Sequence, residues 1–214
     1  MNRSLIDERS GYDRDAIAAH EADLAHPQRI APISHRDLTP EALATINGIR
    51  ASVGAGPTTG EDVPEYFLTM VKHPAMFRHQ LEMGAAIFTG QISARDRELV
   101  VLRIGWLLCA PYEWGEHVDI GKRAGLSPDE IERIIVGADA PGWNETDFAI
   151  LRAVEQLLTK QVITDDVWNA LAGYWSEAQL IEFLMIAGQY VATALLQNAL
   201  RVRLAADNAG LTQR

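Results

Sequence analysis

The sequence has little of what commits a chain to disulfide bonds, metal cages or membranes. Its 214 residues include 1 cysteine, which excludes an intramolecular disulfide framework and a metal site made only of thiolates. No apolar run approaches the roughly 18 residues that a membrane span needs. The first 27 residues contain no apolar core of the kind that a secretory signal carries. These absences predict a cytoplasmic protein.

Positive charge is scarce as well. The chain has 19 Lys and Arg residues against 29 Asp and Glu, which gives a formal net charge of −10. Affinity for nucleic acids comes mainly from Lys and Arg that neutralise phosphates, and anionic membrane surfaces attract proteins in the same way. Although "AGLSPDEIERI" is similar to the turn of a helix-turn-helix, no basic recognition helix accompanies it. We therefore expect neither nucleic acid nor membrane as a partner.

The alternation of apolar and polar residues that marks half-buried strands is also missing. Apolar residues make up 48% of the chain and recur at helical spacing instead. N-cap residues mark where helices should begin. They are Thr39 followed by Pro40, Ser93, Ser127 with Glu130, and Ser176 with Gln179. The sequence predicts an all-α fold.

Proline and polar residues divide the chain into three parts. Residues 1–35 are polar and broken by Pro27 and Pro32, which predicts an N-terminal extension containing a short helix. Residues 36–206 are expected to form a single helical domain, and residues 207–214 a C-terminal tail.

Two long apolar segments stand out in the helical part. The segment 176–202 has apolar residues on all its faces, which predicts a central buried helix. Its start, "SEAQLIEFLMIAG", shares a serine, an early glutamate and a final glycine with "SARDRELVVLRIG". This pattern fits two helical hairpins packed around a pseudo-twofold axis, and it equally fits a chance likeness of two capped apolar helices.

The stretch "CAPYEWGEH", residues 109–117, concentrates titratable and aromatic side chains. Proline is tolerated only in the first turn of a helix, so Pro111 predicts that one helix breaks near Cys109 and that another begins at the proline. Glu113 and His117 then lie four residues apart on one face. Such a carboxylate can hold an imidazole in one tautomer and raise its basicity, as general acid–base catalysis near neutral pH requires. The same spacing is also found in ordinary surface contacts, and spacing alone leaves both interpretations open.

The segment "SARDRELVVLRIGWLLCAPYEWGEHVDIGKRAGLSPDEIERI" resembles the central motif of the carboxymuconolactone decarboxylase family, which includes the AhpD-like alkylhydroperoxidases. The likeness lies in the "RDREL" helix start, the step into "YEWGEH" and the "AGLSPDEI" turn. It covers residues 74–137, and the helices up to residue 204 match more loosely. The resemblance implies an AhpD-like helical bundle that assembles as a homo-oligomer, a trimer, hexamer or dimer.

The chain departs from the AhpD-like peroxidases at their catalytic thiols. Those proteins carry Cys-x-x-Cys followed, after three intervening residues, by a His, with a Glu on the preceding helix as proton relay. Aligning His117 with that His places Glu98 at the relay position and puts Ala110 and Glu113 where the two cysteines would be. Cys109 lies one residue away without a second thiol, so a dithiol–disulfide cycle cannot run within one chain. The decarboxylase-type members lack the dithiol and keep the His, and the chain is more similar to them.

The resemblance therefore implies a cofactor-independent enzyme that acts on a small lactone, enol or aromatic-derived substrate. The reaction would be that of a carboxymuconolactone decarboxylase-like carbon–carbon lyase or of an isomerase. In this hypothesis His117 moves a proton to or from carbon, Glu113 orients and charge-compensates the imidazole, and Glu98 completes the relay. Neither pyridoxal nor a metal is required, because an unsaturated lactone itself accepts the electrons.

Aromatic and cationic side chains near this array are the candidate substrate contacts. Tyr112, Trp114 and Trp106 either line an apolar pocket that excludes water or pack in the core. A substrate carboxylate would need a cation from one of two helices: Arg95, Arg97 and Arg103 on one, Arg78 and His79 on the other. Each of these can instead pair with a carboxylate of the protein.

Two other functions fit parts of the sequence. The loss of both thiols fits a non-catalytic helical oligomer that binds a partner. Cys109, just ahead of a helix start, leaves a thiol-dependent hydroperoxide reductase open. No metal site is predicted, because only one His is local and neither HxxxH nor HExxH spacing occurs.

Overall fold

The helices that cap residues predict are present in the computed structural model, which describes residues 14–52 and 56–214. Thr39 Oγ1 accepts a hydrogen bond from the Ala42 amide at 3.2 Å, and Ser93 caps its helix in the same way. The described residues contain no strand, so the all-α prediction is confirmed for them. The α-helices are α1 (Arg14–Leu24), α2 (Pro40–Ser52), α3 (Glu65–Met70), α4 (Pro74–Phe88), α5 (Ala94–Leu107), α6 (Pro111–Arg123), α7 (Pro128–Val136), α8 (Glu145–Lys160), α9 (Asp165–Tyr174) and α10 (Glu177–Leu200). Two 3-10 turns, η1 (His35–Asp37) and η2 (Gly210–Thr212), complete them.

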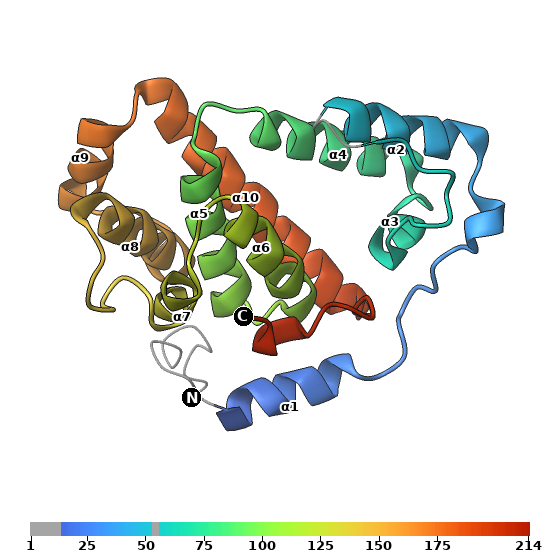
Figure 1. Cartoon of the computed structure of the whole chain (residues 1–214), viewed down its shortest axis with the longest axis horizontal. Helices are drawn as coiled ribbons and strands as arrows, with labels where there is room; N and C mark the ends of the chain where they lie inside the picture. The colour runs from blue at the N-terminus through green and yellow to red at the C-terminus, as the bar shows by residue number, and fades with distance from the viewer. Residues whose placement is uncertain (1–13, 53–55) are drawn as a thin grey trace.

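Helix α5 is the centre of the bundle. All its residues from Asp96 to Leu107 are buried, and it packs against α6, α7, α8 and α10. Helices α7, α8 and α9 lie on one side of this centre, and α2, α3 and α4 lie on the other (Figure 1). The second group has a small core of its own, formed by Ile46, Val63, Leu68, Val71, Phe77 and Leu81.

Helix α10 packs along α5 but is not buried all round. Its inner face includes Phe183, Ile186 and Tyr190, whereas Ile181 and Leu195 are 64% and 54% exposed. The prediction of a helix buried on every face is therefore wrong. By length and composition α10 is also the one described helix that could cross a membrane, but its inner face packs within the bundle against α4, α5, α6 and α9.

The break between α5 and α6 is where the sequence predicts it. Helix α5 ends at Leu107, Cys109 adopts a left-handed backbone with φ of 45°, and α6 begins with Pro111. The Ala110 amide donates to the Gly105 carbonyl at 2.8 Å, which closes the turn. Because the chain reverses here, α6 packs back along α5.

The two ends of the described chain are tied to the bundle. The Arg29 amide donates to the Leu200 carbonyl at 3.1 Å. Residues 1–13 of the expected N-terminal extension lie outside the described residues, but 14–24 do form the short helix. The segment expected to form the C-terminal tail, 207–214, covers α6: the Trp114 indole donates to the Gln213 carbonyl at 3.0 Å, and Leu211 is buried.

Candidate active site

Three predicted residues converge in one buried array. His117 Nδ1 lies 2.6 Å from Glu98 Oε2, and His117 Nε2 lies 3.1 Å from Glu113 Oε1. Glu98 is fully buried, and His117 and Glu113 are 6% and 4% exposed. Both imidazole nitrogens are therefore held by carboxylates away from bulk water.

Local sequence explains this geometry. Glu113 and His117 stand one turn apart on α6, so their side chains share a face. Glu113 also occupies the first turn of α6, where the helix dipole favours a carboxylate. The reversal at Cys109 lays α6 along α5, which brings Glu98 to the opposite edge of the imidazole.

Further side chains fix the two carboxylates. Arg97 Nε donates to Glu98 Oε1 at 2.8 Å, and Gln197 Nε2 donates to Glu113 Oε2 at 2.6 Å. The Tyr190 ring meets the imidazole edge-on, with 5.0 Å between ring centroids. Each catalytic candidate is thus positioned by a neighbour from α5 or α10.

Opposing effects set the pKa of His117. Burial lowers it, but the charge of Glu98 and the hydrogen bonds to both carboxylates outweigh burial and raise the pKa from 6.5 to about 10. Burial raises the pKa of Glu98, yet the imidazolium and the Arg97 guanidinium hold it below its usual value. Below a pH of about 10, His117 is therefore an imidazolium held between Glu98 and Glu113.

A cavity of about 380 Å³ opens beside the array, a size in the range of small-molecule sites. Its walls come from α2, α3, α4, α6 and α10, and they are mostly apolar. Glu113 and His117 line the cavity, whereas Glu98 does not. Glu98 therefore lies behind His117 as seen from the cavity.

The aromatic residues that the sequence singled out separate into two groups. Tyr112 lines the cavity, and burial raises its pKa, so its hydroxyl stays protonated. Trp106 and Trp114 pack in the main hydrophobic core, which is formed mainly by buried residues of α5 to α10. Their ring centroids are 5.1 Å apart. The expectation that these two tryptophans contact substrate is corrected, because the main core and the C-terminal segment cover them.

The expected cations also lie elsewhere. Arg103 is buried and donates to the Ile134 and Ile135 carbonyls at the end of α7 and to Glu155. His79 is exposed on α4 and pairs with Glu82 at 3.3 Å. Neither lines the cavity, so their assignment as substrate contacts is corrected.

The other arginines that the sequence singled out, Arg78, Arg95 and Arg97, do not line the cavity either, and nor does the thiol of Cys109. Arg95 pairs with Asp147 at 2.8 Å and with Glu130, and so ties α5 to α7 and α8. Arg97 supports Glu98 from behind. Cys109 is buried in the main core and is not among the cavity-lining residues.

Sequence reasoning missed the α10 wall of the site. Tyr190, Thr193 and Gln197 all line the cavity, and burial raises the pKa of Tyr190 well above its ordinary value. A signal was present, because three polar residues at spacings of three and four share one face of an otherwise apolar helix. Tyr66 on α3 and Gln80 on α4 add to the polar lining but carry no comparable signal.

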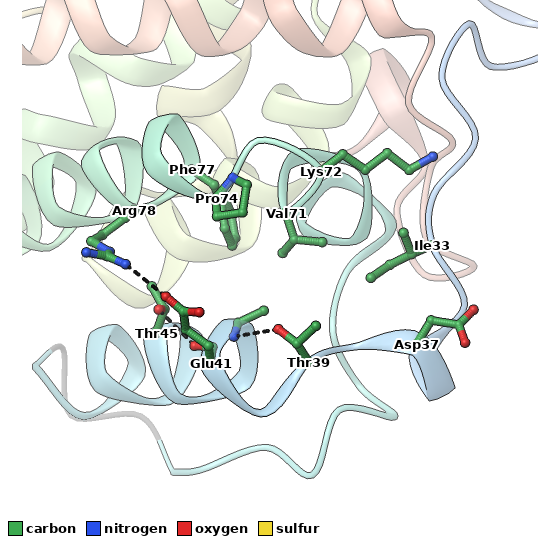
Figure 2. A pocket seen from close by; sticks show the side chains of 11 residues that line it. Ile33, Asp37, Thr39, Glu41, Thr45, Val71, Lys72, Pro74, Phe77 and Arg78 are labelled. Atoms are coloured by element: carbon green, nitrogen blue, oxygen red, sulfur yellow. Dashed lines mark hydrogen bonds and ion pairs between the residues drawn. The ribbon is translucent and has the colours of Figure 1, made fainter.

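A smaller cavity of about 230 Å³ between α2 and the start of α4 holds no comparable array (Figure 2). Arg78 there pairs with Glu41 at 3.3 Å. The Thr39 hydroxyl caps α2, and the Thr45 hydroxyl donates to the Glu41 carbonyl at 3.0 Å. These polar groups serve the helices that carry them, so the cavity beside His117 remains the candidate site.

Comparison with known proteins agrees on the fold. The family model of the carboxymuconolactone decarboxylase family matches residues 74–156. The chain is similar to a protein of unknown function from Agrobacterium tumefaciens, suggested to be the antioxidant defence protein AhpD, at 18% identity and a TM-score of 0.59, covering 64% of this chain and 96% of that one. No curated protein matches the chain.

Two further structures align over more of the chain. The debrominase Bmp8 has a TM-score of 0.67 at 17% identity, covering 86% of this chain and 96% of that one. A peroxidase-related protein with an AhpD core from Ralstonia eutropha JMP134 has a TM-score of 0.69 at 17% identity, covering 86% and 95%. A cysteine-to-alanine variant of the debrominase is known in complex with 2,3,4-tribromopyrrole. At these identities the similarity establishes a common AhpD-like fold.

Proposed function

We propose that the chain, whose residues 74–156 match the model of the carboxymuconolactone decarboxylase family, is a cofactor-independent acid–base enzyme that moves protons to and from carbon in a small unsaturated substrate. The observation that carries this proposal is the buried Glu98–His117–Glu113 array beside a 380 Å³ cavity. A small aromatic ligand in a protein of the same fold, 2,3,4-tribromopyrrole in the debrominase, is consistent with a ring-sized substrate.

The raised pKa of His117 supports a division of roles between a proton donor and a proton acceptor. His117 starts as an imidazolium and is the proton donor, while the Glu113 carboxylate, which also lines the cavity, is the acceptor. Glu98 keeps its Nδ1 contact throughout, which holds the ring in place and stabilises its charge. The sequence predicts only that His117 moves a proton to or from carbon, and the raised pKa favours the donor role.

With these roles, the residues of the array can complete a proton shift on the substrate without a cofactor. Glu113 takes a proton from one substrate carbon, the electron pair moves into the conjugated system, and His117 Nε2 delivers its proton to another carbon. The neutral imidazole recovers a proton from the Glu113 carboxylic acid across the 3.1 Å contact. Decarboxylation would use the same donor. The carbon–carbon bond to the carboxylate breaks, CO₂ leaves, and the unsaturated lactone accepts the electron pair. His117 then protonates the carbon, and solvent returns a proton to His117.

The test is hydrogen–deuterium exchange at substrate carbons in D₂O, followed by NMR over a panel of unsaturated lactones, enols and phenols. We expect the wild-type protein to catalyse exchange on at least one of them. His117→Gln and Glu113→Gln should each lower the rate by about 100-fold or more, the size of a general acid–base contribution. Asp119→Asn is the matched control, because Asp119 is an exposed carboxylate on the same helix.

The proposal fails if no compound exchanges with the wild-type protein, or if the His117 and Glu113 variants retain the wild-type rate. A thiol-dependent peroxidase is distinguished by Cys109→Ser, which we expect to leave exchange unaffected. The buried position of Cys109 outside the cavity supports that expectation.

A further inference from the structure

Gln197 presents a buried hydrogen-bond acceptor that nothing in the described chain satisfies. Its side chain is only 4% exposed. Its Nε2 donates to Glu113, and since a carboxylate oxygen in this pair can only accept, the amide orientation is fixed. The Oε1 atom then has no partner among the described residues. Buried acceptors without a donor are rare in folded proteins, so this one points to a ligand.

A second acceptor of the same kind belongs to Gln80 on α4, which also lines the cavity. Gln80 Nε2 donates to the Tyr66 hydroxyl and lies 3.4 Å from Thr193 Oγ1, while Gln80 Oε1 is buried without a partner among the described residues. Thr193 precedes Gln197 by one turn of α10, and both glutamines line the cavity. Each glutamine therefore belongs to the cavity lining and carries a buried carbonyl oxygen without a partner among the described residues.

The charged residues around the cavity disfavour an anionic ligand. The ionisable residues that line it, apart from tyrosines, are Arg50, Glu113, Glu116 and His117. The imidazolium is already shared by two carboxylates. Arg50 donates to the Gly56 carbonyl at 2.6 Å and faces Asp62. A substrate carboxylate beside Glu113 would meet a like charge in an apolar space, which is costly.

We infer that the cavity selects a neutral ring-sized substrate that donates a hydrogen bond, such as a phenol, an enol or an N–H heterocycle, and that Gln197 Oε1 is the acceptor that positions it. The inference rests on the proposed function, because the donor is held next to Glu113 and His117. It also narrows the reaction. Decarboxylation requires a substrate carboxylate, so a cavity that rejects carboxylates is suited to a proton shift.

The test compares three probes of nearly equal size by isothermal titration calorimetry: 4-methylphenol, its methyl ether 4-methylanisole, and 4-methylbenzoate. We expect the wild-type protein to bind the phenol about tenfold or more tightly than the ether, because only the phenol satisfies the buried acceptor. We expect no measurable binding of the benzoate. Equal binding of phenol and ether, tighter binding of the benzoate, or no binding of any probe overturns the inference.

Gln197→Met keeps the side-chain length and removes the acceptor, so the preference for phenol over ether should fall to about twofold or less. The comparison is a ratio within one variant, so a shift of Glu113 that weakens both ligands cancels. Gln189→Met is the matched control: it makes the same change on the same helix, at a half-buried amide that also lines the cavity but has no buried unpartnered oxygen. This variant should keep the preference. If Gln197→Met does not fold, Gln80→Met removes the second acceptor and should reduce the ratio in the same direction.

The test of ligand preference and the test of deuterium exchange can fail independently of one another. His117→Gln should lose deuterium exchange while it keeps the preference for phenol. A phenol preference without exchange on any compound would leave this inference standing and remove the proposed function. Exchange on a carboxylate substrate, with tighter benzoate binding, would do the opposite.

Discussion

The charge state of His117 is decided by its two neighbours rather than by its burial. Burial alone favours neutral imidazole, but Glu98 and Glu113 hold both nitrogens and raise the pKa to about 10. In the unfolded chain the same residue titrates near its ordinary value of about 6.5. The difference between the two states links proton binding at this one residue to folding stability.

We predict from this linkage how stability depends on pH. The contribution of His117 is complete below pH 6.5, where both states are protonated, and it is lost as pH rises from 6.5 through about 10. Urea unfolding across this range should therefore show the wild-type free energy of unfolding falling more steeply than that of His117→Gln. His79→Gln, a change at an exposed histidine, should follow the wild-type curve. Parallel curves for wild type and His117→Gln would contradict the assigned charge.

The residues of the site differ in how far the sequence could reveal them. Glu113 and His117 follow from helical spacing, and Glu98 follows from the family resemblance. Gln197 pairs with Glu113 across 84 positions of sequence, and no local pattern encodes such a contact. The sequence predicts the wrong role for Arg103, that of a substrate-binding cation. Its charge is visible in the sequence, whereas its partners at the end of α7 are not.

At the scale of elements, local signals predicted helix starts better than helix environments. Proline and cap residues act within one turn, so the break at Cys109 and the start of α10 at Glu177 were predicted correctly. The degree of burial depends on what packs against each face. Helix α10 shows this: its sequence is apolar all round, but neighbours cover only the inner face.

The sequence does not predict that the C-terminal segment 208–214 packs against α6. One glycine makes room for this segment. A Cβ at Gly115 would fall 1.8 Å from Asn208 Oδ1, and Asn208 Nδ2 donates to the Tyr112 carbonyl at 3.1 Å. Gly115→Ala should therefore displace the segment and lower the free energy of unfolding by about 1–3 kcal/mol, measured by urea titration. Gly48→Ala, in α2 where nothing lies within 4 Å, should instead raise it by about 0.5–1 kcal/mol. A neutral Gly115→Ala would show that the segment is not held against α6.

At the scale of the whole molecule, the outer face of α10 is an apolar stripe without a cover in the described chain. Its large exposed residues are Ile181, Leu184, Met185, Leu195 and Leu196. None of the five is charged, whereas the chain as a whole carries a net charge of −10. Such a stripe is larger than the isolated apolar residues that ordinary surfaces expose.

We propose that a second copy of the chain covers this stripe, in line with the homo-oligomer that the family resemblance implies. Two copies with ten excess negative charges each repel one another, and an uncharged apolar surface such as this stripe adds least to that repulsion. An isologous pairing would match the stripe with itself. An anionic membrane is a poorer match, because the stripe contains no Lys or Arg.

Analytical ultracentrifugation tests this arrangement. We expect the wild-type protein to sediment as an oligomer at micromolar concentration, and Leu195→Glu to shift it to the monomer, because a carboxylate at the interface would be buried without a partner. Val162→Glu is the control, since Val162 is 58% exposed but lies after α8, away from the stripe. A monomeric wild-type protein would refute self-association, and a monomer that floats with phospholipid vesicles through the same leucine would identify a lipid surface as the occupant instead. Because Tyr190 and Gln197 stand on the opposite face of the same helix, the Leu195→Glu monomer should retain the phenol preference of the cavity if each copy contains a complete site.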